Sequence, residues 1–336
     1  MTTIGYTMMC EQSGPKDLVG DVLAAEQAGF EFAVISDHYF PWLHEMGHSP
    51  YAWSVLGAAA QATEEIGLMT YVTCPIKRYH PTVVAQKAAT MSLLSDGRFT
   101  LGLGAGENLN EHVTGGGWPP VNIRHAMLDE AVEIISALFD GGYVNFQGTY
   151  FQADSAKLWD LPEVRTPIGI AVSGKQSCEL AGRRADVMIA VEPDGALGSM
   201  FDEAGGYGKP RVGQVPVCFD TDREAAVERA HRLFKWFGGG WKVNAELPGP
   251  QAFADASRFV RPDDVAKSIP CGSHVGEFVT AVKKFTDAGF THVALVQVGG
   301  EQQLPFIAWA EKELLPALRK SNSLGLPDVV AGAGGA

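Results

Sequence analysis

Residues 32–50, FAVISDHYFPWLHEMGHSP, join an apolar run to a polar segment that is rich in histidine. Phe32–Ser36 is apolar at successive rather than alternate positions, which is typical of a strand buried on both faces of a parallel sheet. Asp37 and His38 follow directly, where that strand ends. This stretch therefore predicts a buried strand whose carboxyl end carries ionisable side chains.

The same pattern recurs along the chain, with amphipathic helical segments between the apolar runs. The predicted strands are Ile4–Met9, Phe32–Ser36, Leu68–Thr73, Phe99–Gly104, Ile168–Val172, Val187–Val191, Val212–Phe219 and Val293–Val298. The clearest helical segments are Lys16–Ala28, Tyr51–Thr63, Thr82–Leu94, Ile123–Phe139, Arg223–Phe237 and His274–Ala288. Repeated βα units predict an α/β protein with a (β/α)8 TIM barrel, and an open doubly wound sheet is the alternative.

Two stretches interrupt this alternation. Residues 141–165 contain the turn Asn145–Gly148 followed by two aromatic residues, which predicts a small hairpin. Residues 238–270 contain three consecutive glycines and a Pro-Gly-Pro, which predicts an excursion near the barrel mouth. We expect one domain over residues 1–320, with insertions at the carboxyl-terminal face, and a flexible tail over residues 321–336.

Composition narrows the class of protein. The 336 residues are 46% apolar and carry a formal net charge of −13, which argues against nucleic acid and against an anionic membrane surface. Neither a basic, apolar leader nor a run of about 18 apolar residues is present. The five cysteines are widely spaced and form no C-x-x-C, as in a reduced compartment. We expect a cytoplasmic protein that binds a small molecule.

The segment His44–His48 matches H-E-x-x-H, the zinc-protease signature in which two histidines on one helical face bind the metal. That geometry needs an unbroken helix, but Pro41 and Pro50 bracket the motif and Gly47 lies inside it. No third ligand follows at the expected spacing. We therefore expect these histidines to shape a loop, and we expect no metal.

The carboxyl ends of the predicted strands carry better candidates, because catalytic side chains of a barrel lie there. Glu11 follows the first strand, His38 the second and Glu107 the fourth. Histidine titrates near neutral pH and is the usual general base, although a lone histidine also occurs as a core residue. The spacing predicts that these three side chains share the barrel mouth.

Two glycine-containing segments are weaker signals. GLGAGE, residues 102–107, has Glu107 where the dinucleotide fingerprint has its last glycine. Its small residues suit either close packing of the barrel or close approach of a ligand. Residues 173–175, Ser-Gly-Lys, precede a helical pattern, and helix N-termini favour anions, although ordinary capping is the alternative.

Four segments together resemble the luciferase-like superfamily of flavin and deazaflavin enzymes. They are SDHYFPWLHEMGHSP (36–50), TYVTCPIKRYHPTVVAQ (70–86), GLGAGENLNE (102–111) and IAVSGKQS (170–177). Within that superfamily the chain is similar to the coenzyme F420-dependent glucose-6-phosphate dehydrogenase group. The combination of Ser-Asp-His, a tryptophan four residues after the histidine, and G-x-G-E-x-L-N-E is specific.

The resemblance implies a TIM barrel, usually a homodimer, that binds F420 at its carboxyl face. It implies a non-prolyl cis peptide bond between Tyr71 and Val72, in a bulge behind the deazaflavin ring. The implied cofactor contacts are Asp37, Tyr71, Val72, Cys74, Gly106, Asn110, Ser173, Gly174 and, toward the phosphate, Lys175.

The resemblance also implies roles for four catalytic residues. His38 would remove the substrate's hydroxyl proton while hydride passes to C5 of the deazaflavin, and Glu107 would protonate or polarise the ring. Trp42 would orient the reacting centre, and Glu11 would tune His38 or bind a substrate hydroxyl. The alternatives are an F420H2-dependent reductase of ketones or enones, an FMN-dependent luciferase-like monooxygenase, and a non-catalytic binding protein.

The substrate pocket departs from the family pattern. The glucose-6-phosphate enzymes hold the sugar phosphate with two lysines and an arginine, where this chain has Asp194, Asp255 and Ser268. Carboxylates repel a phosphate, so we expect an unphosphorylated sugar, a secondary alcohol or the corresponding ketone. Misalignment within the variable residues 238–270 is the alternative.

Overall fold

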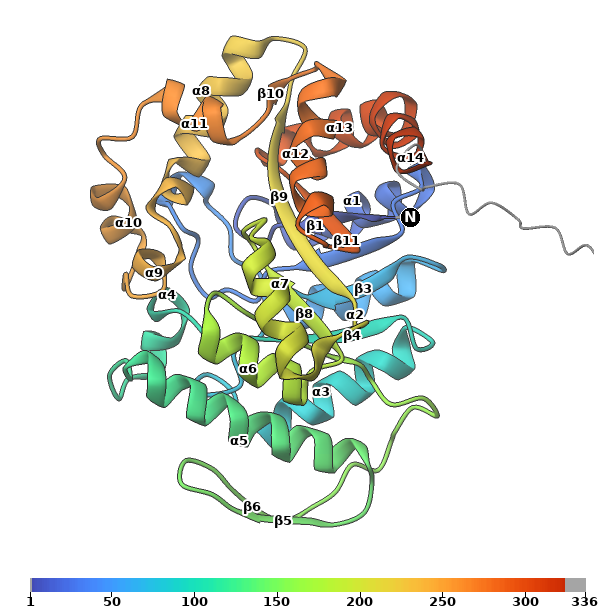
Figure 1. Cartoon of the computed structure of the whole chain (residues 1–336), viewed down its shortest axis with the longest axis vertical. Helices are drawn as coiled ribbons and strands as arrows, with labels where there is room; N and C mark the ends of the chain where they lie inside the picture. The colour runs from blue at the N-terminus through green and yellow to red at the C-terminus, as the bar shows by residue number, and fades with distance from the viewer. Residues whose placement is uncertain (1, 324–336) are drawn as a thin grey trace, which may run out of the picture.

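The computed structural model describes residues 2–323, and parallel strands close into a barrel at its centre (Figure 1). The barrel strands are β1 (Thr3–Met8), β2 (Phe32–Ile35), β3 (Gly67–Thr70), β4 (Phe99–Leu103), β7 (Ile168–Ala171), β8 (Val187–Ala190), β9 (Arg211–Phe219) and β11 (His292–Gln297). They pair in that order, and β11 pairs with β1 to close the ring. The predicted TIM barrel is confirmed, and the open doubly wound sheet is wrong.

Helices surround the barrel. The longer ones are α1 (Pro15–Ala28), α2 (Ala52–Ala62), α3 (Pro81–Leu94), α5 (Val121–Phe139), α6 (Lys175–Arg184), α8 (Arg223–Phe234), α12 (Val275–Asp287) and α14 (Leu315–Ser323). The shorter ones are α4 (Asn108–Glu111), α7 (Gly195–Phe201), α9 (Trp241–Asn244), α10 (Pro250–Ala256), α11 (Pro262–Ser268) and α13 (Gln303–Trp309). Proline opens α1, α3, α10 and α11, where its missing N–H costs nothing.

Short irregular helices and one extra strand complete the chain. The 3-10 turns are η1 (His44–Met46), η2 (His112–Thr114), η4 (Lys235–Gly239) and η5 (Gly300–Gln302), and the π turns are η3 (Asp202–Gly206) and η6 (Ala310–Leu314). The two-residue strand β10 (Cys271–Gly272) pairs with the end of β9.

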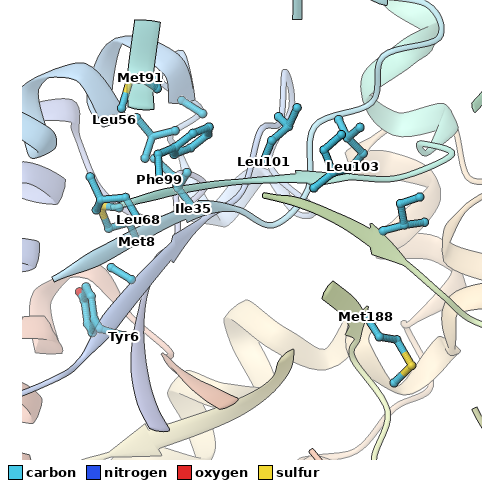
Figure 2. Close-up of a cluster of buried hydrophobic side chains, with 14 of the residues drawn as sticks. Tyr6, Met8, Ile35, Leu56, Leu68, Met91, Phe99, Leu101, Leu103 and Met188 are labelled. Atoms are coloured by element: carbon cyan, nitrogen blue, oxygen red, sulfur yellow. The ribbon is translucent and has the colours of Figure 1, made fainter. Parts of the chain in front are cut away.

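The main core lies between the barrel and the helices. Figure 2 shows Ile35, Leu68 and Phe99 of the barrel strands beside Leu56 of α2 and Met91 of α3. Because every barrel strand is covered on both sides, its residues are apolar at successive positions, as the sequence pattern predicted.

The predicted strand Leu68–Thr73 overruns by three residues, whereas six of the other predicted strands overrun by one. The sequence pattern extends from Leu68 to Thr73, but β3 ends at Thr70 and the chain departs from the ladder at Tyr71. The Tyr71–Val72 peptide bond is cis, as the resemblance implied. Thr73 then rejoins the sheet through an isolated bridge to Leu103.

The two insertions lie in different places. Residues 141–165 form the expected hairpin, in which β5 (Val144–Gln147) and β6 (Gln152–Ala156) pair antiparallel. It lies on the outer side of α5 (Figure 1), whose Glu130 accepts hydrogen bonds from the amides of residues 149–151. Residues 238–270 form α9, α10 and α11, and Figure 1 shows α9 beside α4. Only the second insertion therefore reaches the barrel mouth.

The C-terminal helix α14 extends to Ser323, so the first residues of the expected tail are helical, and residues 324–336 lie outside the described residues. Over residues 2–323, no helix combines the length and apolar character that crossing a membrane requires. The thiols of Cys10, Cys74, Cys178, Cys218 and Cys271 are buried and unbridged.

Replacing Gly102 tests how tightly β3 and β4 pack. A Cβ at Gly102 would lie 1.9 Å from the Thr70 carbonyl oxygen, whereas a Cβ at Gly57 of α2 would meet nothing within 4 Å. We expect Gly102→Ala to lower the free energy of unfolding by about 2 kcal/mol or more. The control Gly57→Ala should change it by less than about 1 kcal/mol, in the stabilising direction. Equal effects in urea denaturation would contradict this packing.

Candidate active site

A cavity of about 770 Å³ opens at the carboxyl ends of the barrel strands. The loops after β1, β2, β3 and β4, the start of α6 and the segment around α9 form its wall. Its volume lies within the usual range for small-molecule sites. The three side chains predicted to share the barrel mouth, Glu11, His38 and Glu107, all line this cavity.

Glu11, His38 and Glu107 form one buried acid–base cluster. His38 Nδ1 contacts Glu11 Oε1, and His38 Nε2 lies 3.2 Å from Glu107 Oε1. The other oxygen of Glu11 accepts a hydrogen bond from the Ser36 hydroxyl at 2.8 Å. The imidazole therefore lies between two carboxylates, and each ring nitrogen faces one of them.

This arrangement controls the charge of His38. Burial alone lowers its pKa, but the carboxylates of Glu11 and Glu107 outweigh burial and raise the pKa to about 10. Burial alone would raise the pKa of Glu11, yet the nearby His38 lowers it below the ordinary glutamate value. In the absence of a ligand, His38 is therefore a protonated imidazolium at neutral pH.

An aromatic wall adjoins His38. The Trp42 ring meets the His38 ring edge to face at 5.0 Å, and its own face stacks on Trp236 at 4.1 Å. Phe253 of α10 packs against Trp42 from the side, with ring centroids 5.0 Å apart. Phe234 and Met9 extend the apolar lining. These contacts fix Trp42, and through it they limit rotation of His38.

Asp37 lines the cavity, but its carboxylate is committed to protein donors. Oδ2 accepts from Trp53 Nε1 at 3.1 Å and from the Thr73 hydroxyl at 2.8 Å. Oδ1 accepts from the Tyr79 hydroxyl at 3.1 Å, and Arg78 lies 3.5 Å away. Asp37 therefore ties the loop after β2 to the loop after β3.

The floor of the cavity is built from small residues. A Cβ at Gly106, where φ is +77°, would lie 2.4 Å from Cys74 Sγ, and one at Gly104 would lie 2.6 Å from Val72. Asn110 of α4 accepts hydrogen bonds from the backbone amides of Tyr39 and Phe40, which fixes the loop that carries His38. Gly104 and Gly106 are required because a side chain at either position would clash with Val72 or Cys74, and Gly106 also has a positive φ.

Polar groups mark the end of the cavity near α6. The amides of Ser173 and Gly174 donate to the Ser177 hydroxyl, and the exposed Lys175 lies 3.9 Å from Glu179. Arg124 of α5 is buried, and its guanidinium donates to Glu246 at 2.8 Å. This end carries the positive charge that the aromatic wall lacks.

Residues 235–246 close the cavity over Glu107. The Asn108 amide donates to the Ala245 carbonyl at 3.0 Å, and the Asn108 side chain donates to the Glu246 carbonyl at 3.1 Å. This segment contributes Trp236, Phe237, Trp241 and Lys242 to the lining.

The three predicted substrate residues are not brought to this cavity. Asp194, Asp255 and Ser268 are exposed, none of them lines it, and Asp194 instead caps α7 by accepting from the Ala196 amide. The sequence analysis missed Arg124, Trp236 and Asn244, which do line it. The aromatic pair before three glycines was a usable signal for Trp236, whereas Arg124 lies unmarked within a helical pattern.

The H-E-x-x-H segment does not form the helix that zinc proteases need. His44–Met46 is a single 3-10 turn, and Gly47 leaves it with φ at +79°. The two histidines therefore do not lie on consecutive turns of one helical face.

Replacing Glu11 tests the charge balance of the cluster. Glu11→Gln removes one of the two carboxylates that stabilise the imidazolium, so the His38 pKa should fall by at least about one unit. Histidine ring NMR across pH, with the His38 signal assigned by its loss in His38→Gln, measures this. Glu45→Gln, an exposed glutamate in the same loop, is the control. An unchanged His38 pKa in Glu11→Gln would refute the arrangement.

Comparison with known proteins places this site in a family. The family model described as luciferase-like monooxygenase matches residues 2–304. The F420-dependent glucose-6-phosphate dehydrogenase of Amycolatopsis mediterranei (strain U-32) is 34% identical over 336 residues, which cover 95% of this chain and 99% of that protein. The enzyme of that name from Nakamurella multipartita is 35% identical, with 94% and 96% covered.

Solved structures agree. An F420-dependent secondary alcohol dehydrogenase in complex with an F420-acetone adduct superposes with a TM-score of 0.86 at 29% identity, covering 95% of this chain and 99% of that one. The coenzyme F420-dependent tetrahydromethanopterin reductase from Methanopyrus kandleri superposes with a TM-score of 0.76 at 21% identity, covering 94% and 99%, which shows the shared fold. The chain belongs to the luciferase-like monooxygenase family, and within it is similar to the F420-dependent glucose-6-phosphate dehydrogenases.

Proposed function

We propose that this chain is an F420-dependent oxidoreductase that transfers hydride between the carbon of a CH–OH group and C5 of the deazaflavin. The observation that carries the proposal is the buried Glu11–His38–Glu107 cluster at a cavity large enough for a cofactor. The names of the relatives, which are F420-dependent dehydrogenases of a sugar phosphate and of secondary alcohols, support it.

The residues of the cavity fit F420. Gly104, Ala105 and Gly106 line the cavity without projecting large side chains into it, which suits a flat ring. Glu107 Oε2 is buried and has no hydrogen-bond partner within residues 2–323, so a ligand group can satisfy it. Ser173, Gly174, Lys175 and Arg124 would hold the anionic end of the cofactor.

When bound, F420 supplies a hydride acceptor at C5 and activates oxygen poorly, which favours a dehydrogenase or reductase over an FMN-dependent monooxygenase. His38 handles the proton. In alcohol oxidation, neutral Nε2 takes the hydroxyl proton of the substrate, while Glu11 holds Nδ1 and stabilises the imidazolium that results. Trp42 keeps the ring facing the cavity.

The aromatic wall supports an unphosphorylated substrate. Trp42, Trp236 and Phe234 surround the approach to His38 and offer apolar surface to the substituents of the reacting carbon. Of the cations of the cavity wall, Arg124 and Lys175 come from α5 and α6, and Lys242 belongs to the segment that carries Trp236. We therefore favour a secondary alcohol or the matching ketone over a sugar phosphate.

The charge of His38 favours ketone reduction as a second candidate direction. With a pKa of about 10, His38 carries its proton at neutral pH and can donate it to the oxygen of a ketone that receives hydride. Alcohol oxidation needs neutral His38, which is the minor form at pH 7.

A cofactor assay tests the reaction. Purified protein with oxidised F420 should lose the visible absorbance of the cofactor when a secondary alcohol is added, and glucose 6-phosphate should be the poorer substrate. His38→Ala should lower kcat about 100-fold or more. His44→Ala, which removes an exposed histidine of the same loop, should leave kcat unchanged. Saturable turnover of glucose 6-phosphate well above that of alcohols would overturn the substrate assignment.

The pH dependence separates the two directions. The rate of alcohol oxidation should rise by up to about tenfold per pH unit from 7 toward 10, as His38 loses its proton. The rate of ketone reduction with reduced F420 should not rise over that range, and it should fall near pH 10 as His38 loses its proton. Initial rates in both directions measure this, and an oxidation rate independent of pH would contradict His38 as the base.

Two further expectations belong to this proposal. The resemblance implies a homodimer, which light scattering of the purified protein measures. The five buried thiols support a reducing compartment such as the cytoplasm, because free cysteines persist there.

A further inference from the structure

Lys87 of α3 lies in an unusual place for a lysine. Its Nζ is buried and has no hydrogen-bond acceptor in the part of the chain that the structure describes. Three aromatic rings surround it instead: the Nζ lies 3.4 Å from the ring centroid of Tyr79, 5.0 Å from that of Tyr51 and 5.3 Å from that of Trp53. Ring faces attract a cation, so the three rings take the place of the missing hydrogen-bond acceptor.

Two rings of the cage also hold Asp37. Tyr79 donates its hydroxyl to Asp37 Oδ1 at 3.1 Å, and Trp53 donates Nε1 to Oδ2 at 3.1 Å. The rings of Tyr79 and Trp53 therefore lie between the ammonium of Lys87 and the carboxylate of Asp37.

The buried charges around Asp37 balance only when Lys87 is counted. Arg78 lies 3.5 Å from Asp37 and donates to Glu111 at 2.9 Å, so one guanidinium faces two carboxylates. Lys87 adds the second positive charge. An unbalanced charge in a buried cluster is costly, because the protein interior screens charge more weakly than bulk water does.

This cluster is connected to the catalytic histidine. Arg78 donates to the backbone carbonyl of Asp37 at 2.6 Å, and Asp37 immediately precedes His38. A change in the cluster therefore changes the backbone that places the imidazole between Glu11 and Glu107.

We propose that Lys87 is a positioning residue, which balances the buried charge around Asp37 and thereby holds His38 in its reactive place. The inference rests on the proposed function for its effect on rate, whereas the cage itself can be measured in the protein without any ligand.

The balance of charge around Asp37 depends on pH because Lys87 can lose its proton. Burial lowers the pKa of Lys87 to about 8. Of the groups that face it, burial raises the pKa values of Tyr51 and Tyr79, so both stay neutral, and the carboxylates of Asp37 and Glu111 raise the pKa of Arg78 despite its burial. Burial also raises the pKa of Glu111, and the ion pair with Arg78 opposes that rise. Lys87 is therefore the group that changes charge in mildly alkaline solution.

Two substitutions test this inference, one that removes the charge of residue 87 and one that keeps it at every pH used. Lys87→Met keeps a long apolar side chain and removes the charge, whereas Lys87→Arg stays charged at every pH used. Lys284→Met on α12, which removes an exposed lysine, is the control. Circular dichroism melts establish that each variant is folded, and either Lys87 variant alone suffices for the fluorescence test below.

Tryptophan fluorescence of the ligand-free protein is the first measurement. The wild type and Lys284→Met should show a step in emission near pH 8, because Trp53 lies against the titrating ammonium. The step should be absent from Lys87→Met and from Lys87→Arg. Its persistence in either Lys87 variant would overturn the cage.

The second measurement is the rate. At pH 7, Lys87→Met should lower kcat about tenfold, with the KM for the alcohol changed less than twofold, because the reacting groups are misplaced rather than removed. Above pH 8 the ratio of the Lys87→Arg rate to the wild-type rate should rise, and the His38 titration cancels in that ratio. An unchanged kcat in Lys87→Met would overturn the positioning role.

Failure of the proposed function gives a different result. If the wild type turned over no alcohol or ketone, the assay would reject the proposed reaction, while the fluorescence step would still decide whether Lys87 titrates within its cage.

Discussion

His38 lies between the buried carboxylates of Glu11 and Glu107, and the barrel brings these three side chains together so that each has a partner of opposite charge. An unpaired charge buried this deeply would be so costly that the pKa of the group would shift until the group was neutral. Here Glu11, which is fully buried, has the imidazole on one oxygen and the Ser36 hydroxyl on the other. The strands β1, β2 and β4 must therefore end at the same rim of the barrel, although β3 lies between β2 and β4, because each delivers one member of the cluster within its first residues after the ladder.

The strands and the ends that carry Glu11, His38 and Glu107 were predictable because a doubly covered parallel strand has a local signature. Continuous apolar runs identify it, and the barrel rule then assigns function to whatever polar residue follows. The prediction overran at Leu68–Thr73, since the residues that leave the ladder at Tyr71 are as apolar as those within it.

The rest of the site could not be predicted from local patterns. Arg124 lies within an amphipathic helix, and its place at the cavity depends on how the start of α5 meets the segment after α9. Asp255 and Ser268 were assigned by alignment through residues 238–270, where an offset of a few residues moves a side chain from the cavity to solvent. Asp194 was assigned in the same way, and it caps α7 instead. Lys87 was unmarked for a similar reason, because its cage is assembled from three separate segments.

The segment that closes the cavity is bonded to Asn108, the residue next to Glu107. Selection of the substrate and proton chemistry are therefore not separate properties of this enzyme. A ligand too large for the aromatic wall would push residues 235–246 outward and pull on the backbone beside Glu107. Such a ligand would lose rate as well as affinity, so the enzyme would discriminate by size at the chemical step. Replacing aromatic residues to enlarge the pocket would then keep Glu107 in place beside His38 only if both Asn108 hydrogen bonds are retained.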